Sequence, residues 1–147
     1  MEDERMKRFV KCLCLILALS FCLALPAAAA EAPYGSSFFG SRDAYLWSTS
    51  GTSCEAWFEI TAVRGMAELG AKYIDIERSS DGVNWQVVKT YNRSNYSNMI
   101  ANNTSDHCSY VTYSEMQPGY QYRMYVNFYA KDANGNIATS GAYGYFI

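Results

Sequence analysis

Two carboxylates in this sequence are spaced so that they could act together in acid–base chemistry. Asp75 and Glu77 alternate with Ile74 and Ile76, an apolar–polar pattern that predicts a β-strand. Side chains two residues apart on a strand point to the same face, with about 6.5–7 Å between their Cα atoms. This separation overlaps the carboxylate spacing of glycoside hydrolases, so a small glycan hydrolase is one hypothesis. The competing interpretation is a solvated strand face on which Glu77 meets Arg123 of a neighbouring strand.

The other polar residues do not complete a catalytic or metal-binding motif. Residues 132–136 begin like a calcium loop, but an EF-hand needs Gly at its sixth position and Glu at its twelfth, where this chain has Ile137 and Tyr143. An Asn-Gly hairpin turn explains the segment better. His107 is the only histidine, and Cys108 is expected in a disulfide, which leaves no nucleophile to pair with the imidazole. The sequence therefore predicts no catalytic residue, no metal site and no cofactor.

Residues 1–30 have the layout of a signal peptide. Basic residues near Met6 are followed by an apolar run and by four alanines that end at Ala30, the small residues that a signal peptidase reads. We therefore expect an N-terminal signal helix, cleavage after Ala30, and a secreted, extracellular domain. Two alternatives stay open. One is a lipoprotein anchored at Cys22, although Phe21 stands where a small residue is needed; the other is a retained anchor, although the apolar run is shorter than the ~20 residues of a spanning helix.

The remainder of the chain has the composition of one small β-rich domain. Residues 31–42 contain Pro, Gly and Ser and are expected to form a flexible leader, which leaves residues 43–147 for the folded domain. The 13 tyrosines, together with many Gly and Asn residues, favour strands over helices. The formal net charge is only −2 and no basic stripe is present. Nucleic acid and, after signal cleavage, membrane surfaces are therefore poor candidate partners.

Period-2 alternation and turn residues divide the domain into about seven strands. The longest regular pattern follows the Pro-Gly turn in residues 116–130, where alternate residues from Tyr122 to Ala130 are expected to face the core. The same alternation is expected to turn Cys54, Ala56, Phe58, Ile60 and Ala62 to one face of their strand and Ile74 and Ile76 inward. Asp81-Gly82 marks a hairpin turn. This strand count favours an antiparallel sandwich over a closed barrel. The expected strands are residues 43–48, 52–63, 72–79, 83–91, 108–115, 116–130 and 137–147, with a connection at 63–70 and a polar loop at 93–106.

Two segments resemble the fibronectin type III family. Residues 116–122, Met-Gln-Pro-Gly-Tyr-Gln-Tyr, resemble the turn before strand F, and Tyr122 matches the corner tyrosine whose hydroxyl bonds to the backbone upstream. Residues 73–85 resemble the strand C to C′ hairpin of bacterial members. The resemblance covers residues 50–147 and implies an all-β, antiparallel, immunoglobulin-like sandwich. It departs from the family at Trp57, which falls on the opposite face from the tryptophan expected in strand B.

As a whole, the chain resembles small secreted proteins of Gram-positive gut bacteria that have a fibronectin type III-like domain and no assigned function. That resemblance implies location and fold, and no activity. Cys54 and Cys108 remain after the signal, and an even pair in an exported protein predicts one disulfide. It would close a loop of about 55 residues and contribute roughly 4 kcal/mol at most. The implied sandwich puts the two cysteines on neighbouring strands; two buried free thiols are the alternative.

The outward residues of two strands suggest where function would lie. If residues 73–79 and 123–131 form neighbouring strands, their outward side chains make one patch: Tyr73, Asp75, Glu77, Arg123, Tyr125, Asn127 and Tyr129. Tyrosines among fixed polar groups suit sugar and protein surfaces, because the rings provide contact area with little rotamer entropy to lose. We therefore predict a secreted, non-catalytic binding or interaction module for an extracellular glycan or protein. The alternatives are the hydrolase above and a structural envelope component without a small ligand.

Overall fold

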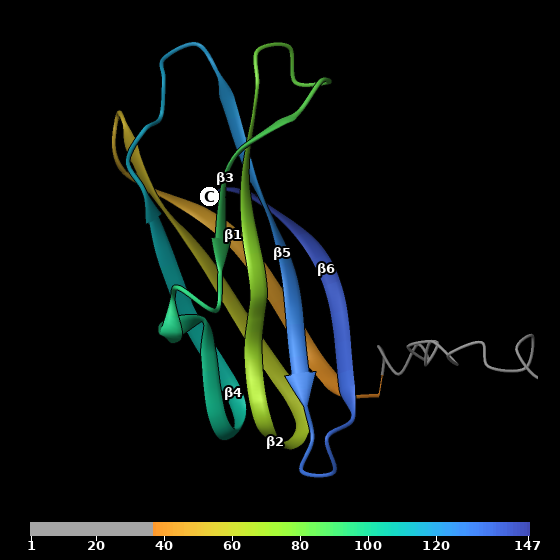
Figure 1. Ribbon diagram of the computed structural model, residues 1–147. Coiled ribbons are helices and arrows are strands. Elements are labelled where there is room, and N and C mark those ends of the chain that lie inside the picture. The colour runs from red at the N-terminus through yellow and green to blue at the C-terminus, as the bar shows by residue number, and fades with distance from the viewer. Residues whose placement is uncertain (1–36) are drawn as a thin grey trace, which may run out of the picture. The chain divides into compact units, whose positions relative to one another are not determined.

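The computed structural model describes residues 37–147, so the expected signal peptide and the first half of the expected leader, residues 31–36, lie outside the described residues. Within that range the chain forms six strands and one short 3-10 helix (Figure 1). Strand β1 begins at Phe39, ahead of the expected start at Asp43. The elements are β1 (Phe39–Ser50), β2 (Ser53–Ser79), β3 (Gln86–Asn92), η1 (Ser97–Met99), β4 (Ile100–Tyr113), β5 (Gln121–Lys131) and β6 (Ile137–Phe146).

Four of these strands close into a small mixed β-barrel. The first half of β2 pairs with β1, its second half pairs with β5, and β5 pairs with β6, all antiparallel. The ring closes through a parallel pair between β6 and β1, with Tyr145 opposite Tyr45 and Phe146 opposite Leu46. Strands β3 and β4 are extra strands that pair with β2 outside this ring. The predicted fibronectin type III-like sandwich is therefore wrong, because the strands close into a barrel and one pair is parallel.

The length of β2 explains why the strands predicted from the sequence differ from those of the structure. The prediction places a connection at residues 63–70, whereas β2 is one continuous strand of 27 residues. The strand turns back on itself near its middle (Figure 1), and its ladder with β4 continues through the bend, with Met66 opposite Thr104 and Gly70 opposite Ile100. A register shift just before Met66 adds the residues that allow the bend. One strand thus pairs with both of its neighbours in the ring, with β1 through its first half and with β5 through its second half. The expected loop at 93–106 is likewise replaced by η1 and the start of β4.

Gly70 fixes the place where the bend meets η1. Its φ is +155°, and a Cβ atom there would lie 2.0 Å from the carbonyl oxygen of Met99. Only glycine, which has no side chain, permits so close an approach of two backbone segments. After this contact the chain enters β4 at Ile100. Like β3 before it, β4 pairs antiparallel with β2.

The inward residues predicted from alternation are confirmed. Phe58 of β2 and Phe128 of β5 are fully buried and meet edge to face, with 6.4 Å between their ring centroids. Each large apolar side chain buried in this way stabilises the fold by roughly 1.5–3 kcal/mol. The predicted core positions that are buried are Cys54, Ala56, Phe58, Ile60, Ala62, Ile74, Ile76, Tyr122, Met124, Val126, Phe128 and Ala130.

The predicted disulfide between Cys54 and Cys108 is wrong, because both are free cysteines. Strands β2 and β4 are neighbours, as expected, but Cys54 pairs with Tyr113 and is buried, whereas Cys108 pairs with Glu59 and is exposed. The two thiols therefore lie on opposite faces of the sheet. Five positions along β2, from 54 to 59, separate them by roughly 17 Å, whereas a disulfide needs Cα atoms within ~7 Å. Burial raises the pKa of the Cys54 thiol to about 11.

The start of β5 contains the contact that the family resemblance implies for Tyr122. The Tyr122 hydroxyl accepts a hydrogen bond of 2.8 Å from the backbone N–H of Gln117, five residues upstream. Between them Gly119 supplies a φ of +84°, which the turn requires. The tyrosine corner is thus a local structure set by the Pro-Gly-Tyr-Gln-Tyr sequence, and here it occurs in a barrel.

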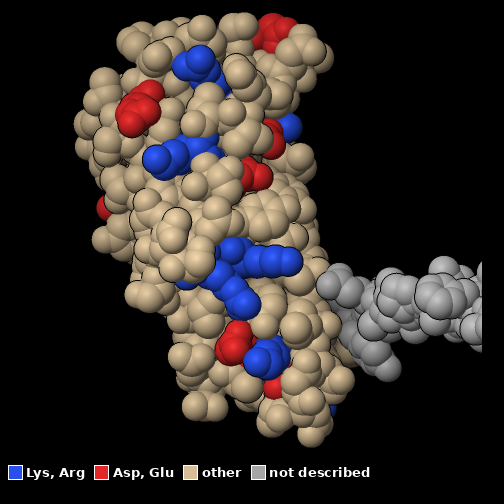
Figure 2. All heavy atoms as spheres, viewed as in Figure 1, with Lys and Arg blue, Asp and Glu red and all other residues tan. Residues whose placement is uncertain are grey.

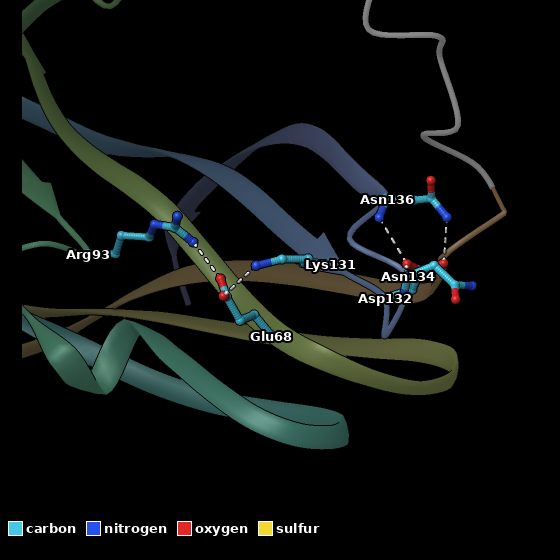
Figure 3. Close-up of polar contacts among 6 residues, drawn as sticks. All are labelled: Glu68, Arg93, Lys131, Asp132, Asn134 and Asn136. Carbon is cyan, nitrogen blue, oxygen red and sulfur yellow. Dashed lines mark hydrogen bonds and ion pairs between the residues drawn. The ribbon is translucent and has the colours of Figure 1, made fainter.

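Residues 132–136 form the turn between β5 and β6, as predicted. The Asp132 carboxylate accepts hydrogen bonds of 2.9 Å from the backbone N–H groups of Asn134 and Asn136 and from the Asn136 side chain (Figure 3). These bonds, led by the Asn136 side chain, lower the pKa of Asp132. An Asx-type turn of this kind needs only the carboxylate and the glycine at position 135, whose φ is +85°.

Candidate functional site

The ladder between β2 and β5 brings the sequence-predicted patch together. Tyr73 lies opposite Asn127, Asp75 opposite Tyr125, and Glu77 opposite Arg123. The two strands are thus neighbours, as the prediction requires. These six side chains are all half-buried, so they form a packed surface with limited freedom. We call this surface, together with Tyr143 of β6, the tyrosine face.

A row of three tyrosines crosses the tyrosine face from β2 to β6. The ring centroids of Tyr73 and Tyr125 are 6.1 Å apart, and those of Tyr125 and Tyr143 are 5.1 Å apart. Gly141 makes the room for this row, because a Cβ atom there would lie 2.1 Å from the Tyr125 hydroxyl. Tyr143 was not among the sequence-predicted site residues. Counting residues outward from the turn at 132–136 would have found it, since the hairpin places Tyr143 opposite Tyr125.

Arg123 is held in place between two aromatic rings. Its guanidinium carbon lies 4.2 Å from the Trp85 ring centroid and 4.3 Å from that of Tyr143. Its Nε donates a 2.6 Å hydrogen bond to the Glu77 carboxylate. Burial disfavours the charge on Arg123, but the hydrogen bond and negative charge of Glu77 outweigh it and raise the pKa of the guanidinium. Trp85, like Tyr143, was absent from the predicted patch.

The two carboxylates of the hydrolase hypothesis are both engaged. Glu77 forms the ion pair with Arg123, and Asp75 accepts a hydrogen bond from the Thr90 hydroxyl of β3. A general acid or base must have a carboxyl oxygen free to approach the reacting group, whereas both of these side chains already contact partners within the protein. The arrangement therefore suits the tethering of neighbouring strands better than acid–base chemistry.

The tyrosine face ends at Asn127, because Tyr129 is covered. The Arg93 guanidinium carbon lies 4.2 Å from the Tyr129 ring centroid, and only 4% of Tyr129 is exposed. Glu68 holds the Arg93 side chain over this ring through an ion pair of 3.1 Å, and it forms a second ion pair of 3.2 Å with Lys131 (Figure 3). Burial opposes ionisation of Glu68, but the Lys131 hydrogen bond and the neighbouring positive charges lower its pKa. Including Tyr129 in the accessible patch was therefore wrong.

A second outward surface lies on β1, the first half of β2 and β4. Its centre is a stack of three rings: Trp57 lies 4.5 Å from Tyr110 and 6.4 Å from Tyr45, centroid to centroid. Its register places Tyr45 opposite Trp57 and Trp47 opposite Glu55. We call it the acidic aromatic face, because its outward positions carry carboxylates among the rings: Asp43, Tyr45, Trp47, Glu55, Trp57, Glu59, Asp106, Cys108 and Tyr110.

A groove of about 690 Å³ follows the seam between β3 and β4. Side chains bridge the seam: the Tyr91 hydroxyl donates to the Thr112 carbonyl at 2.7 Å, and the Asn98 amide donates to the Tyr110 carbonyl at 2.8 Å. These bonds occupy backbone acceptors that an added strand would use. His107 does not line the groove: its ring packs against the buried Phe58, and its Nε2 lies 2.9 Å from the carbonyl oxygen of Asn98. The groove is thus partly closed by the chain's own side chains.

Basic and acidic side chains are interspersed over the surface in view, without a broad patch of one sign (Figure 2). Among residues 37–147 no group of three or more His, Cys, Asp or Glu side chains is arranged to hold a metal ion. The same residues include no helix with the length and apolarity needed to span a membrane. No protein-family model matches the chain, and no curated protein sequence matches it.

Proposed function

We propose that this chain is a secreted, non-catalytic binding module that holds an extracellular glycan on its tyrosine face. The observation that carries the proposal is the fixed row of Tyr73, Tyr125 and Tyr143, held in place at Gly141. Sugar rings present apolar C–H faces that pack on aromatic rings, and their hydroxyls need polar partners beside those rings. Asn127 and the Arg123–Glu77 pair provide such partners at the edges of the row.

The geometry favours binding over hydrolysis. A glycosidase needs one carboxyl group free to donate a proton and a second free to act as base or nucleophile. Here Glu77 is held by Arg123 and Asp75 by Thr90. Rigid rings with few rotatable bonds, in contrast, lose little entropy when a ligand arrives.

A glycan and mucin binding screen tests the proposal. Tyr143→Ala removes an exposed ring from the end of the row, and we expect it to weaken binding at least fivefold. Tyr125→Ala should do the same. Tyr110→Ala removes another exposed tyrosine, this one from the acidic aromatic face, and is the matched control.

Binding that is unchanged in both Tyr125→Ala and Tyr143→Ala would rule out the tyrosine face as the binding surface. Glycan cleavage by the wild-type protein that disappears in Asp75→Asn would show that the hydrolase hypothesis is the better one. Binding to protein surfaces but to no glycan would replace the ligand class while leaving the face in place.

A further inference from the structure

The acidic aromatic face contains a small cup made by two successive cross-strand pairs. Tyr45 and Trp57 form one pair, Trp47 and Glu55 the next, and together they line a cavity of about 210 Å³. The indole N–H of Trp57 donates a 2.9 Å hydrogen bond to the Glu55 carboxylate, which fixes both side chains. Trp47 forms the open side, with 52% of its surface exposed.

The charge around the cup is negative and is not balanced within the described residues. The outward positions of β1, the first half of β2 and β4 include Asp43, Glu55, Glu59 and Asp106, but no Lys or Arg between residues 37 and 147 occupies such a position. Arg42 of β1 points toward Ser140 and the Phe39 ring instead. Burial, followed by the hydrogen bond to Glu59 and its charge, raises the pKa of Tyr45.

Aromatic rings beside a carboxylate also occur elsewhere in the molecule. Rings and a carboxylate elsewhere hold a cation: Arg123 lies between Trp85 and Tyr143 and pairs with Glu77. Arg93 covers the Tyr129 ring and pairs with Glu68 in the same way. Among residues 37–147 the remaining cation–ring contacts are Arg42 on Phe39, Arg64 on Phe38, Arg78 on Tyr120 and Lys89 on Tyr91. The cup of Tyr45, Trp47, Trp57 and Glu55 has the same components without a described cation.

We propose that this cup binds an organic ammonium group, in particular a quaternary one such as a trimethylammonium headgroup. Aromatic faces attract cations through the ring quadrupole, tryptophan most strongly, and quaternary ammonium ions suit them because their charge cannot be satisfied by hydrogen bonds. Glu55 adds a full negative charge beside the rings, and Glu59 and Asp43 extend the field that attracts the ligand. The cavity is smaller than the 300–1,000 Å³ of sites for drug-sized ligands, which fits a headgroup.

Titration of the purified protein with choline, followed by NMR of the tryptophan indole N–H signals, tests the proposal. We expect saturable shifts at Trp47 and Trp57 and none of comparable size at Trp85, which lies outside the cup. The neutral isostere 3,3-dimethylbutan-1-ol has the same shape without the charge. It should bind at least fivefold more weakly, since it loses both the ring–cation and the carboxylate attraction.

Two substitutions locate the site. Trp47→Ala removes the most exposed ring, and Glu55→Gln removes the charge while keeping the shape and an acceptor for the Trp57 indole; each should weaken choline binding about fivefold to tenfold. Tyr143→Ala on the tyrosine face is the matched control and should leave choline binding unchanged. Circular dichroism and the thermal midpoint establish that each variant is folded.

Further ligands identify the source of the ammonium group. Phosphocholine represents a lipid or polymer headgroup, and trimethyl-lysine amide represents a modified protein side chain; tighter binding of one assigns the source. Equal binding of choline and its neutral isostere, or tighter binding of a neutral sugar at the cup, would overturn the proposal. So would an absence of saturable shifts in tens of millimolar choline, or unchanged binding in both Trp47→Ala and Glu55→Gln.

Discussion

The two outward aromatic surfaces of this barrel are built from the same kinds of residue and differ in charge. On the tyrosine face Arg123 lies between two rings and pairs with Glu77, so the rings and carboxylate already have their cation. On the acidic aromatic face the described hydrogen-bond donors to Glu55 and Glu59 are neutral: the Trp57 indole for Glu55, and the Tyr45 hydroxyl and the Cys108 thiol for Glu59. One face therefore presents a nearly neutral surface, and the other presents negative charge beside open rings.

The difference teaches that aromatic content alone does not identify a ligand. A row of tyrosines around a satisfied ion pair offers flat contact area and fixed dipoles, which suits a neutral, hydroxyl-rich partner. Stacked rings beside carboxylates that have no positively charged partner create a negative electrostatic potential, which attracts a cation. The internal Arg123 contact is thus a precedent, within the same molecule, for the ligand contact proposed at the cup.

The largest expected effect is the difference in labelling rate between the two cysteines. A disulfide between them would contradict the described acidic aromatic face, on which Cys108 points outward. Cys108 lies outward on the acidic aromatic face and Cys54 is buried beneath the same sheet. We expect Cys108 to react with a thiol reagent in the native protein, and Cys54, fully buried and with a pKa raised to about 11, only after unfolding. Rates should differ by several orders of magnitude, since Cys54 must wait for opening of the core.

Mass spectrometry after labelling at pH 8 assigns each site, and in the control Cys108→Ser neither Cys54 nor position 108 should be labelled in the native protein. If Cys54 and Cys108 both stay unlabelled under denaturing, non-reducing conditions, the two cysteines are bridged. In that case β4 could not present Tyr110 and Cys108 outward as described.

Gly70→Ala should disrupt both faces at once, because Gly70 lies at the bend that separates them. The new Cβ would be 2.0 Å from the Met99 carbonyl oxygen, and backbone cannot move aside as a flexible side chain can. We expect a loss of about 3 kcal/mol or more in the free energy of unfolding. Urea denaturation measures it.

Gly65→Ala is the matched control in the same strand, since a Cβ atom added at Gly65 would have no other atom within 4 Å and no positive φ is required there. Its effect should stay within about 0.5 kcal/mol. Equal stabilities of the two variants would show that the approach of η1 to the bend does not constrain the fold.

Arg123→Met sharpens the comparison by removing the internal cation while keeping most of the packing. Glu77 would be left half-buried without its partner, so we expect a loss of about 2 kcal/mol. Glu55→Gln on the acidic aromatic face breaks no ion pair with a described Lys or Arg. It should therefore change the free energy of unfolding by less than about 0.5 kcal/mol.

A double-mutant cycle with Glu77→Gln separates the ion pair from the ring contacts. A large coupling energy between Arg123 and Glu77 supports the pair as the main term. Additive effects would instead assign the stabilisation to the rings of Trp85 and Tyr143.

Local patterns in the sequence predicted much of this structure. Alternation identified the buried faces of β2 and β5 because a strand with one face in a core must repeat every two residues. The turns at Asp81-Gly82 and at residues 132–136 were also predictable, since Asx carboxylates and glycines with positive φ carry their own geometry. The Tyr122 contact is local in the same sense.

Longer-range features could not be read in this way. Gly65 and Gly70 mark chain reversal equally in a loop and in a bent strand, and only the ladder with β4 distinguishes the two. The parallel pair between β1 and β6 joins distant segments and leaves no periodic signal. The cysteine prediction failed for a related reason: counting cysteines gives a number, whereas the face of each thiol depends on its register. The cup was missed because its four residues come from two strands whose pairing had not been proposed.

The smallest predicted effect is a change in the ionisation of Tyr45 on the acidic aromatic face. Its pKa is raised by burial first and then by the hydrogen bond and charge of Glu59. Because the folded pKa lies above the unfolded value, the associated stability is fully present below about pH 10. It is lost as the pH rises through the folded pKa.

Glu59→Gln keeps an acceptor for the Tyr45 hydroxyl and removes the charge, so the pKa of Tyr45 should fall toward its ordinary value and the loss of stability at high pH should shrink. NMR of ¹³C-labelled tyrosine rings follows the titration. Tyr91, whose pKa burial raises to about 12, serves as an internal reference that should not move. If Tyr45 titrates identically in the variant, the charge of Glu59 does not act at this ring. The titration would then not support a negative potential at this part of the acidic aromatic face. The contrast between the two faces would depend only on the presence of Arg123 in the tyrosine face.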